Sequence, residues 1–125
     1  MRNKDIPEIV RQTLLDHNIT EYPVDLLQLS RRAGIKVIKD SDVDELAAGE
    51  YGECLFCDNQ WYIVYDDTQP LDKRRFTVAH ELGHIFLKHN EEHDRFMKHI
   101  EDLKIKHNRK IERQADIFAR HLINT

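Results

Sequence analysis

The pentapeptide His80-Glu81-Leu82-Gly83-His84 constrains this chain more than any other feature of its sequence. Residues four apart lie on one face of an α-helix, so both imidazoles can point at a single ion if the segment is helical. Neutral imidazole is a good ligand for Zn²⁺, and the glutamate after the first histidine can reach a water molecule on the metal. The pattern therefore predicts a helix that carries His80 and His84 as metal ligands and places Glu81 within reach of a water molecule on the metal.

A catalytic zinc ion needs a third protein ligand on another element and an open position for water. We favour Glu112, because Asp116 lies one turn later on the same face and can accept a hydrogen bond from the second nitrogen of a ligand histidine. Ala115 and Ala119 are small, as a close crossing against the helix of the pentapeptide requires. Other histidines stay open as third ligands: His89, His93, His99, His107 and His121.

Composition excludes several other classes of function. The net charge of −4 and the pI near 6.0 argue against binding to nucleic acid. The four glycines form no phosphate-binding loop, and no G-x-S-x-G motif is present. The longest apolar run, residues 61–65, is too short to span a bilayer, and the first residues do not resemble a secretory signal. We therefore expect a cytoplasmic protein without membrane contacts.

Apolar spacing predicts an α+β fold in which helices flank a small antiparallel sheet, with a single domain over residues 1–125. In the short second helix we expect Leu26, Leu27, Leu29 and Ala33 to be buried. The predicted elements are a helix to Asp16, a helix opened by Pro23 and ended by Gly34, a strand at 35–38, a loop or edge at 39–49, strands at 51–56 and 61–65 joined by a turn at 58–60, a helix over 71–88, a weak helical pattern within 90–108, and a helix over 109–122.

The residues around the pentapeptide also resemble a known family. The stretch 74–87, with its R-F-T-x-A-H-E-x-G-H core, is similar to the signature of the ImmA/IrrE family of metallopeptidases. The later Glu112-x-x-Ala115-Asp116-x-Phe118-Ala119 is similar to that family's second motif. The resemblance covers roughly residues 20–122. It implies a zincin-like core, with His80, His84 and Glu112 as zinc ligands and Glu81 as the catalytic residue.

The resemblance further implies a bacterial or mobile-element (phage-related) setting and a protein substrate. Members of the family often act on, or through, a helix-turn-helix repressor, and its proteolysis releases a set of genes. The family usually continues beyond the Phe-Ala motif, so we expect this chain to lack a C-terminal extension. The segment 90–108 matches no feature of the family.

The catalytic role of several other residues stays open. An oxyanion partner is needed for peptide hydrolysis, and Tyr62, Tyr65 and His121 are the candidates. Cys54 and Cys57 form a C-x-x-C in a predicted hairpin, where two reduced cysteines are the simplest interpretation.

Three functions are compatible with the motifs. The first is a zinc endopeptidase directed at a repressor. The second is a zinc-containing regulatory protein that binds a repressor or another partner without cleaving it. The third is a structural zinc domain, which is the weakest of the three because it gives Glu81 no role.

Overall fold

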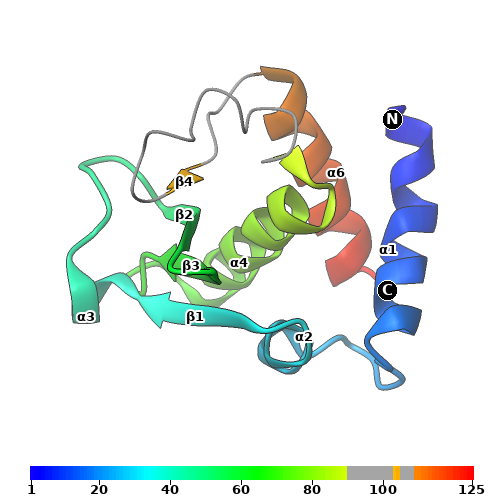
Figure 1. The fold of residues 1–125 in the computed structure, drawn as a ribbon, viewed down its shortest axis with the longest axis horizontal. Helices are drawn as coiled ribbons and strands as arrows, with labels where there is room; N and C mark the ends of the chain where they lie inside the picture. Colours follow the sequence, from blue (N-terminus) through cyan, green and yellow to red (C-terminus); the bar gives the residue numbers. More distant parts are fainter. Residues whose placement is uncertain (90–102, 105–108) are drawn as a thin grey trace.

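A computed structural model describes residues 1–89, 103–104 and 109–125 of the chain. The helix α4 lies between the helix α6 and the sheet, and α1 packs on the outer side of α6 (Figure 1). This mixture of helices with a small sheet confirms the predicted α+β class. The helices are the 3-10 turn η1 (Asn3–Asp5), α1 (Ile6–Asp16), α2 (Leu26–Arg32), α3 (Asp40–Val43), α4 (Leu71–Phe86) and α6 (Arg109–Ile123). The strands are β1 (Ile35–Lys39), β2 (Gly52–Cys57), β3 (Gln60–Tyr65) and β4 (Leu103–Lys104).

The sheet is mixed, with the strand order β1-β3-β2-β4. β2 and β3 form a hairpin in which Cys57 pairs with Gln60. Its two turn residues, Asp58 and Asn59, both have positive φ, as the tight turns of hairpins require. β1 lies parallel to β3, so the prediction of a wholly antiparallel sheet is wrong at this edge. The error has a physical reason: alternation along a strand indicates its buried face but not the direction of its neighbour.

The short helix α2 begins three residues after Pro23, because Asp25 is its N-cap. The Asp25 carboxylate accepts hydrogen bonds from backbone N–H groups of the first turn. The expectation that Leu27 is buried is wrong, since its side chain is 52% exposed. A helix of seven residues buries one narrow stripe against the core, and here Leu26 and Leu29 form that stripe.

The acidic stretch 39–49, expected as a loop or edge, contains the single-turn helix α3. The Asp40 carboxylate accepts hydrogen bonds from the backbone N–H groups of Glu45 and Leu46, which folds the chain back after the helix. Asp44 ends the helix in the left-handed conformation, which aspartate tolerates better than most residues.

Most of the segment 90–108 lies outside the described residues, so the helical pattern expected there stays a prediction. The exception is the pair Leu103–Lys104, whose backbone forms β4. These two residues pair antiparallel with Leu55 and Phe56 of β2.

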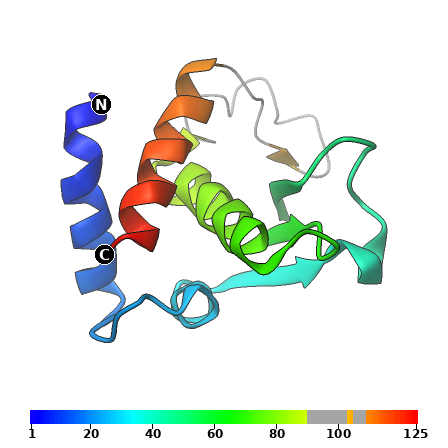
Figure 2. The same ribbon diagram turned by 180° about the vertical axis from the view of Figure 1, so that it is seen from behind.

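The crossing of α4 and α6 is close because residue 83 is glycine. A Cβ atom at Gly83 would lie 3.1 Å from the Cα and carbonyl oxygen of Ala115 and 3.2 Å from the Cβ of Phe118. Behind this contact the rings of Phe86 and Phe118 stack with centroids 6.0 Å apart. From the reverse side, α6 is seen lying between α4 and α1 (Figure 2). The close approach explains a glycine that costs about 1 kcal/mol of helix propensity relative to alanine.

Among the described residues, no helix has the length and apolar content that a bilayer crossing requires.

Candidate metal centre

The predicted helix of the pentapeptide is α4, and it presents both histidines on one face. His84 is fully buried, and the side chain of His80 is 14% exposed. Their ring centroids lie 4.8 Å apart with the planes nearly perpendicular. The spacing of four residues therefore brings two imidazoles together at a largely buried place.

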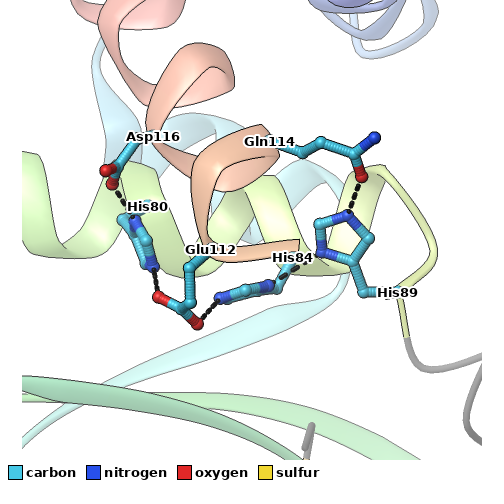
Figure 3. A network of polar contacts seen from close by, with 6 residues as sticks. All are labelled: His80, His84, His89, Glu112, Gln114 and Asp116. Carbon is cyan, nitrogen blue, oxygen red and sulfur yellow. Dashed lines mark hydrogen bonds and ion pairs between the residues drawn. The ribbon is translucent and has the colours of Figure 1, made fainter. Parts of the chain in front are cut away.

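Two acidic residues of α6 complete this arrangement (Figure 3). Glu112 spans both rings: its Oε2 lies 2.9 Å from Nε2 of His80 and its Oε1 lies 3.0 Å from Nε2 of His84. Asp116, one turn later, has its Oδ1 2.7 Å from Nδ1 of His80. The structure thus brings Glu112 and Asp116 to the positions in which a ligand and its supporting carboxylate are expected.

Electrostatics set the two histidines far apart in pKa. Burial disfavours a charged His80, but the hydrogen bond to Glu112 and the carboxylates of Glu81, Glu112 and Asp116 outweigh it and raise its pKa to about 9. For His84, burial is the largest effect, and the neighbouring His80 also disfavours a second positive charge. Together they lower the pKa of His84 to about 4 against the opposing hydrogen bond to Glu112.

Glu81 lies in the same cluster and is buried, with 3% of its surface exposed. One ligand atom each from His80, Glu81 and His84 fall within 4.8 Å of one another, so these three could hold a metal ion. Glu81 also faces the sheet. Burial, together with the charge and hydrogen bond of Glu81, raises the pKa of the Cys54 thiol on β2 well above its ordinary value.

The residues present fit a divalent metal. Each Glu112 oxygen lies within about 3 Å of the Nε2 atom of one of the two histidines, and two imidazoles with a carboxylate are a donor set that Zn²⁺ takes in catalytic sites. The second nitrogen of each ring also has a polar partner, as ligand histidines require. Glu112 contacts both rings, as a third ligand would, and its role as that ligand, with Glu81 acting on a water molecule, stays a prediction.

The two tyrosines lie on different faces of β3. Tyr62 faces a hollow lined by Ile38 and Val43, on the side of the sheet opposite the buried Ile63 that packs toward α4. Tyr65 lies on the α4 side, in a hollow with Arg74 and residues of α2. Of the two, only Tyr65 lies on the face of the sheet that packs against α4, the helix of Glu81. Its role as an oxyanion partner stays a prediction.

The remaining candidates separate as follows. His121 is exposed and lines a hollow between α6 and α1, far along α6 from Glu112. His93, His99 and His107 lie outside the described residues. Cys54 and Cys57 form no disulfide bond. They lie an odd number of positions apart on β2, so their side chains point to opposite faces of the sheet.

Sequence reasoning named His89 as an alternative third ligand but missed its buried position and its partners. The spacing suggests a histidine at a helix end or at the rim of the site. In the structure it is fully buried, with Nδ1 2.8 Å from Nδ1 of His84 and Nε2 2.9 Å from Oε1 of Gln114. Its position follows from Lys88, whose left-handed conformation turns the chain back toward α4. A histidine three residues past the end of α4 was the only local signal.

The family of the chain is shown by a match to a known family model. Residues 30–124 match the family model of M78 peptidases, described as the IrrE N-terminal-like domain. The chain belongs to this family. M78 peptidases are metal-dependent, which agrees with the group of side chains in this chain that could hold a metal ion. No curated protein and no solved structure gives a significant match. The likeness to the zincin core therefore stays a prediction.

Proposed function

We propose that this M78 family member is a zinc-dependent endopeptidase in which His80, His84 and Glu112 hold the ion. The observation that supports the proposal best is Glu112, which reaches from α6 to the Nε2 atoms of both α4 histidines. Carboxylate and imidazole from two separate helices converge in this way at catalytic zinc sites with an open fourth position. Two histidines that lay on α4 by chance would not be expected to meet a carboxylate of another helix at both Nε2 atoms.

Zinc, when bound, would lower the pKa of a water molecule and polarise the scissile carbonyl. Glu81 follows the first ligand on the same helix and is held in a buried place beside β2. Its carboxylate is the base that takes the proton of the attacking water and passes it to the leaving amine. Asp116 fixes the ring of His80 by accepting the hydrogen bond of its Nδ1–H.

The substrate that we propose is a helix-turn-helix transcriptional repressor, and cleavage would release the genes that it blocks. Support comes from membership in the family and from the resemblance of stretch 74–87 to the ImmA/IrrE signature. A repressor substrate implies work in the cytoplasm of a bacterial host. The competing function is binding of the repressor without cleavage, and it leaves the metal centre in place.

Glu81→Gln separates these two functions. The amide keeps the shape and the neighbours of Glu81 but cannot accept the proton. Where a helix-turn-helix repressor is encoded beside the gene, its cleavage should fall by roughly 10²- to 10⁴-fold, while zinc content stays at the wild-type level. Glu8→Gln, at an exposed glutamate of α1, is the matched control and should cleave normally. Undiminished cleavage by Glu81→Gln would overturn the peptidase proposal. If neither wild type nor variant cleaves while both bind the repressor, the function is regulation by binding.

A further inference from the structure

The two candidate ligand histidines are supported by different chemistries on the side away from the metal. Nδ1 of His80 meets the carboxylate of Asp116 at 2.7 Å. Nδ1 of His84 meets another imidazole, that of His89, at 2.8 Å, and the far nitrogen of His89 meets Oε1 of Gln114 at 2.9 Å (Figure 3). His84, His89 and Gln114 thus form a chain of three polar groups without a carboxylate, each fully or almost fully buried.

The position of one proton in this chain determines what His84 can do. Between the two facing Nδ1 atoms only one ring can donate, and the other must accept. If His89 donated from Nδ1, its neutral ring would turn a lone pair toward Gln114, whose oxygen is also an acceptor. With the Gln114 oxygen at this place, Nε2 of His89 carries the proton. Its Nδ1 then accepts the hydrogen bond from Nδ1–H of His84.

The same arrangement leaves Nε2 of His84 as a lone pair that points toward Glu112. This is the nitrogen and the protonation state that a metal ligand needs, since a metal cannot bind a nitrogen that holds a proton. The chain of hydrogen bonds therefore favours the metal-binding tautomer of His84, whereas the 3.0 Å contact with Oε1 of Glu112 favours a proton on Nε2 as long as no metal is bound.

A neutral support also suits the burial of the two rings. His84 and His89 are both 0% exposed, whereas Asp116 is 39% exposed beside His80. A carboxylate placed behind His84 would have to be desolvated completely, which is strongly unfavourable unless the charge is paired. A glutamine oxygen relayed through an imidazole supplies an acceptor there without burying a charge.

We infer that His89 and Gln114 are positioning residues of the metal centre, which fix the tautomer and the ring orientation of His84 and so raise the affinity for the metal. The inference rests on the proposed function in one respect, namely that His84 binds the ion through Nε2. It needs no catalytic step and extends the centre from α4 and α6 to the turn after α4.

The test compares the zinc affinity of purified variants by competition with a chromogenic chelator. His89→Leu keeps the buried volume but removes the acceptor, and zinc should bind about 10- to 100-fold more weakly. His89→Asn places an amide oxygen near the position of the lost Nδ1 and should recover most of the affinity. Gln114→Leu should weaken zinc binding in the direction of His89→Leu. The exposed His121→Leu is the control and should bind zinc as wild type does.

Equal zinc affinity of His89→Leu and wild type would overturn the inference, as would His89→Asn binding as weakly as His89→Leu. Nitrogen-15 NMR of zinc-loaded wild type reads the tautomers directly and does not depend on a variant folding. Nε2 of His89 and Nδ1 of His84 should be protonated, and a protonated Nδ1 on His89 contradicts the chain. Wild type that binds no zinc would instead reject the proposed function, so the two failures are distinguishable.

Discussion

At the scale of single residues, the two α4 histidines differ in acid–base behaviour because their partners differ. His80 faces carboxylates through both ring nitrogens, and its pKa is raised to about 9. His84 faces one carboxylate and one imidazole in complete burial, and its pKa is lowered to about 4. In the metal-free protein at neutral pH, the centre therefore holds one positive charge, on His80. A metal ion bound by both rings would replace this proton.

This difference predicts how the stability of the metal-free protein changes with pH. Native His80 binds its proton more tightly than the unfolded chain does, so its contribution is complete below pH 6.5 and is lost as pH rises through about 9. Native His84 resists protonation, so stability also falls as pH drops from 6.5 toward 4. Urea unfolding with a chelator present should show both losses in wild type.

The variant His80→Gln isolates the alkaline limb of this profile. It retains a polar side chain but has no titrating group, so its free energy of unfolding should not share the loss between pH 6.5 and 9. Parallel curves for wild type and His80→Gln across this range would contradict the assignment of the raised pKa to His80.

His89 shows where single-residue prediction from the sequence ends. His80, His84, Glu112 and Asp116 could be placed because spacings of four within a helix define a shared face. His89 could not, because its position depends on the backbone of Lys88 and its partner Gln114 is 25 residues away. Nothing in the local pattern separates such a histidine from a solvated one.

At the scale of elements, the crossing of α4 and α6 sets the geometry of the centre, and Gly83 sets the crossing. Gly83→Ala would gain about 1 kcal/mol of helix propensity. The added Cβ would press on the backbone of Ala115, which cannot rotate away, and such overpacking costs about 1–3 kcal/mol. We expect a net loss of unfolding free energy of up to ~2 kcal/mol, with weaker zinc binding because Glu112 moves away with α6.

Denaturant unfolding and zinc competition measure the two effects of Gly83→Ala separately. Gly83→Val should be worse in both, since the side chain is larger at the same contact. An alanine variant that is more stable than wild type and binds zinc equally well would show that the helices do not depend on this close approach.

The contact between β2 and α4 has a similar constraint at Gly52. A Cβ atom at Gly52 would overlap Cγ2 of Thr77 and would lie 3.5 Å from Oε2 of Glu81. Gly52→Ala must therefore turn Thr77 away from its hydrogen bond with Gln69 or push α4 from the sheet. We expect a loss of about 1–3 kcal/mol in the free energy of unfolding, measured by urea titration.

Thr77→Ser is the matched partner substitution, because it removes Cγ2 and keeps the hydroxyl group. The double variant Gly52→Ala/Thr77→Ser should recover most of the stability lost in Gly52→Ala. If the two substitutions are simply additive, the steric account of this strand–helix contact is wrong.

The elements themselves were predicted better than their pairing. Period-3.6 and period-2 patterns placed α1, α4, α6 and the β2–β3 hairpin near their observed bounds. The parallel pairing of β1 and the exposure of Leu27 depend on neighbours that are distant in the sequence. Periodicity carries no information about these neighbours.

At the scale of the whole molecule, the proposed ligands come from two helices, α4 and α6. His80 on α4 and Glu112 on α6 are 32 residues apart in the sequence. A metal bound by both helices would act as a cross-link in a chain with 40% apolar residues and 34% charged residues. A ligand that binds only the native state stabilises it by about 2.7 kcal/mol at one hundred times its dissociation constant. The proposed metal centre would then also stabilise the fold.

Metal content tests the central claim most directly. Wild type purified with zinc and dialysed should retain a single zinc ion per chain by elemental analysis, and so should Glu81→Gln. His84→Ala and Glu112→Ala should each lose it, because one removes a ligand from α4 and the other the ligand from α6. Wild type without bound metal, or full zinc content in both ligand variants, would contradict a metal centre built from these two helices.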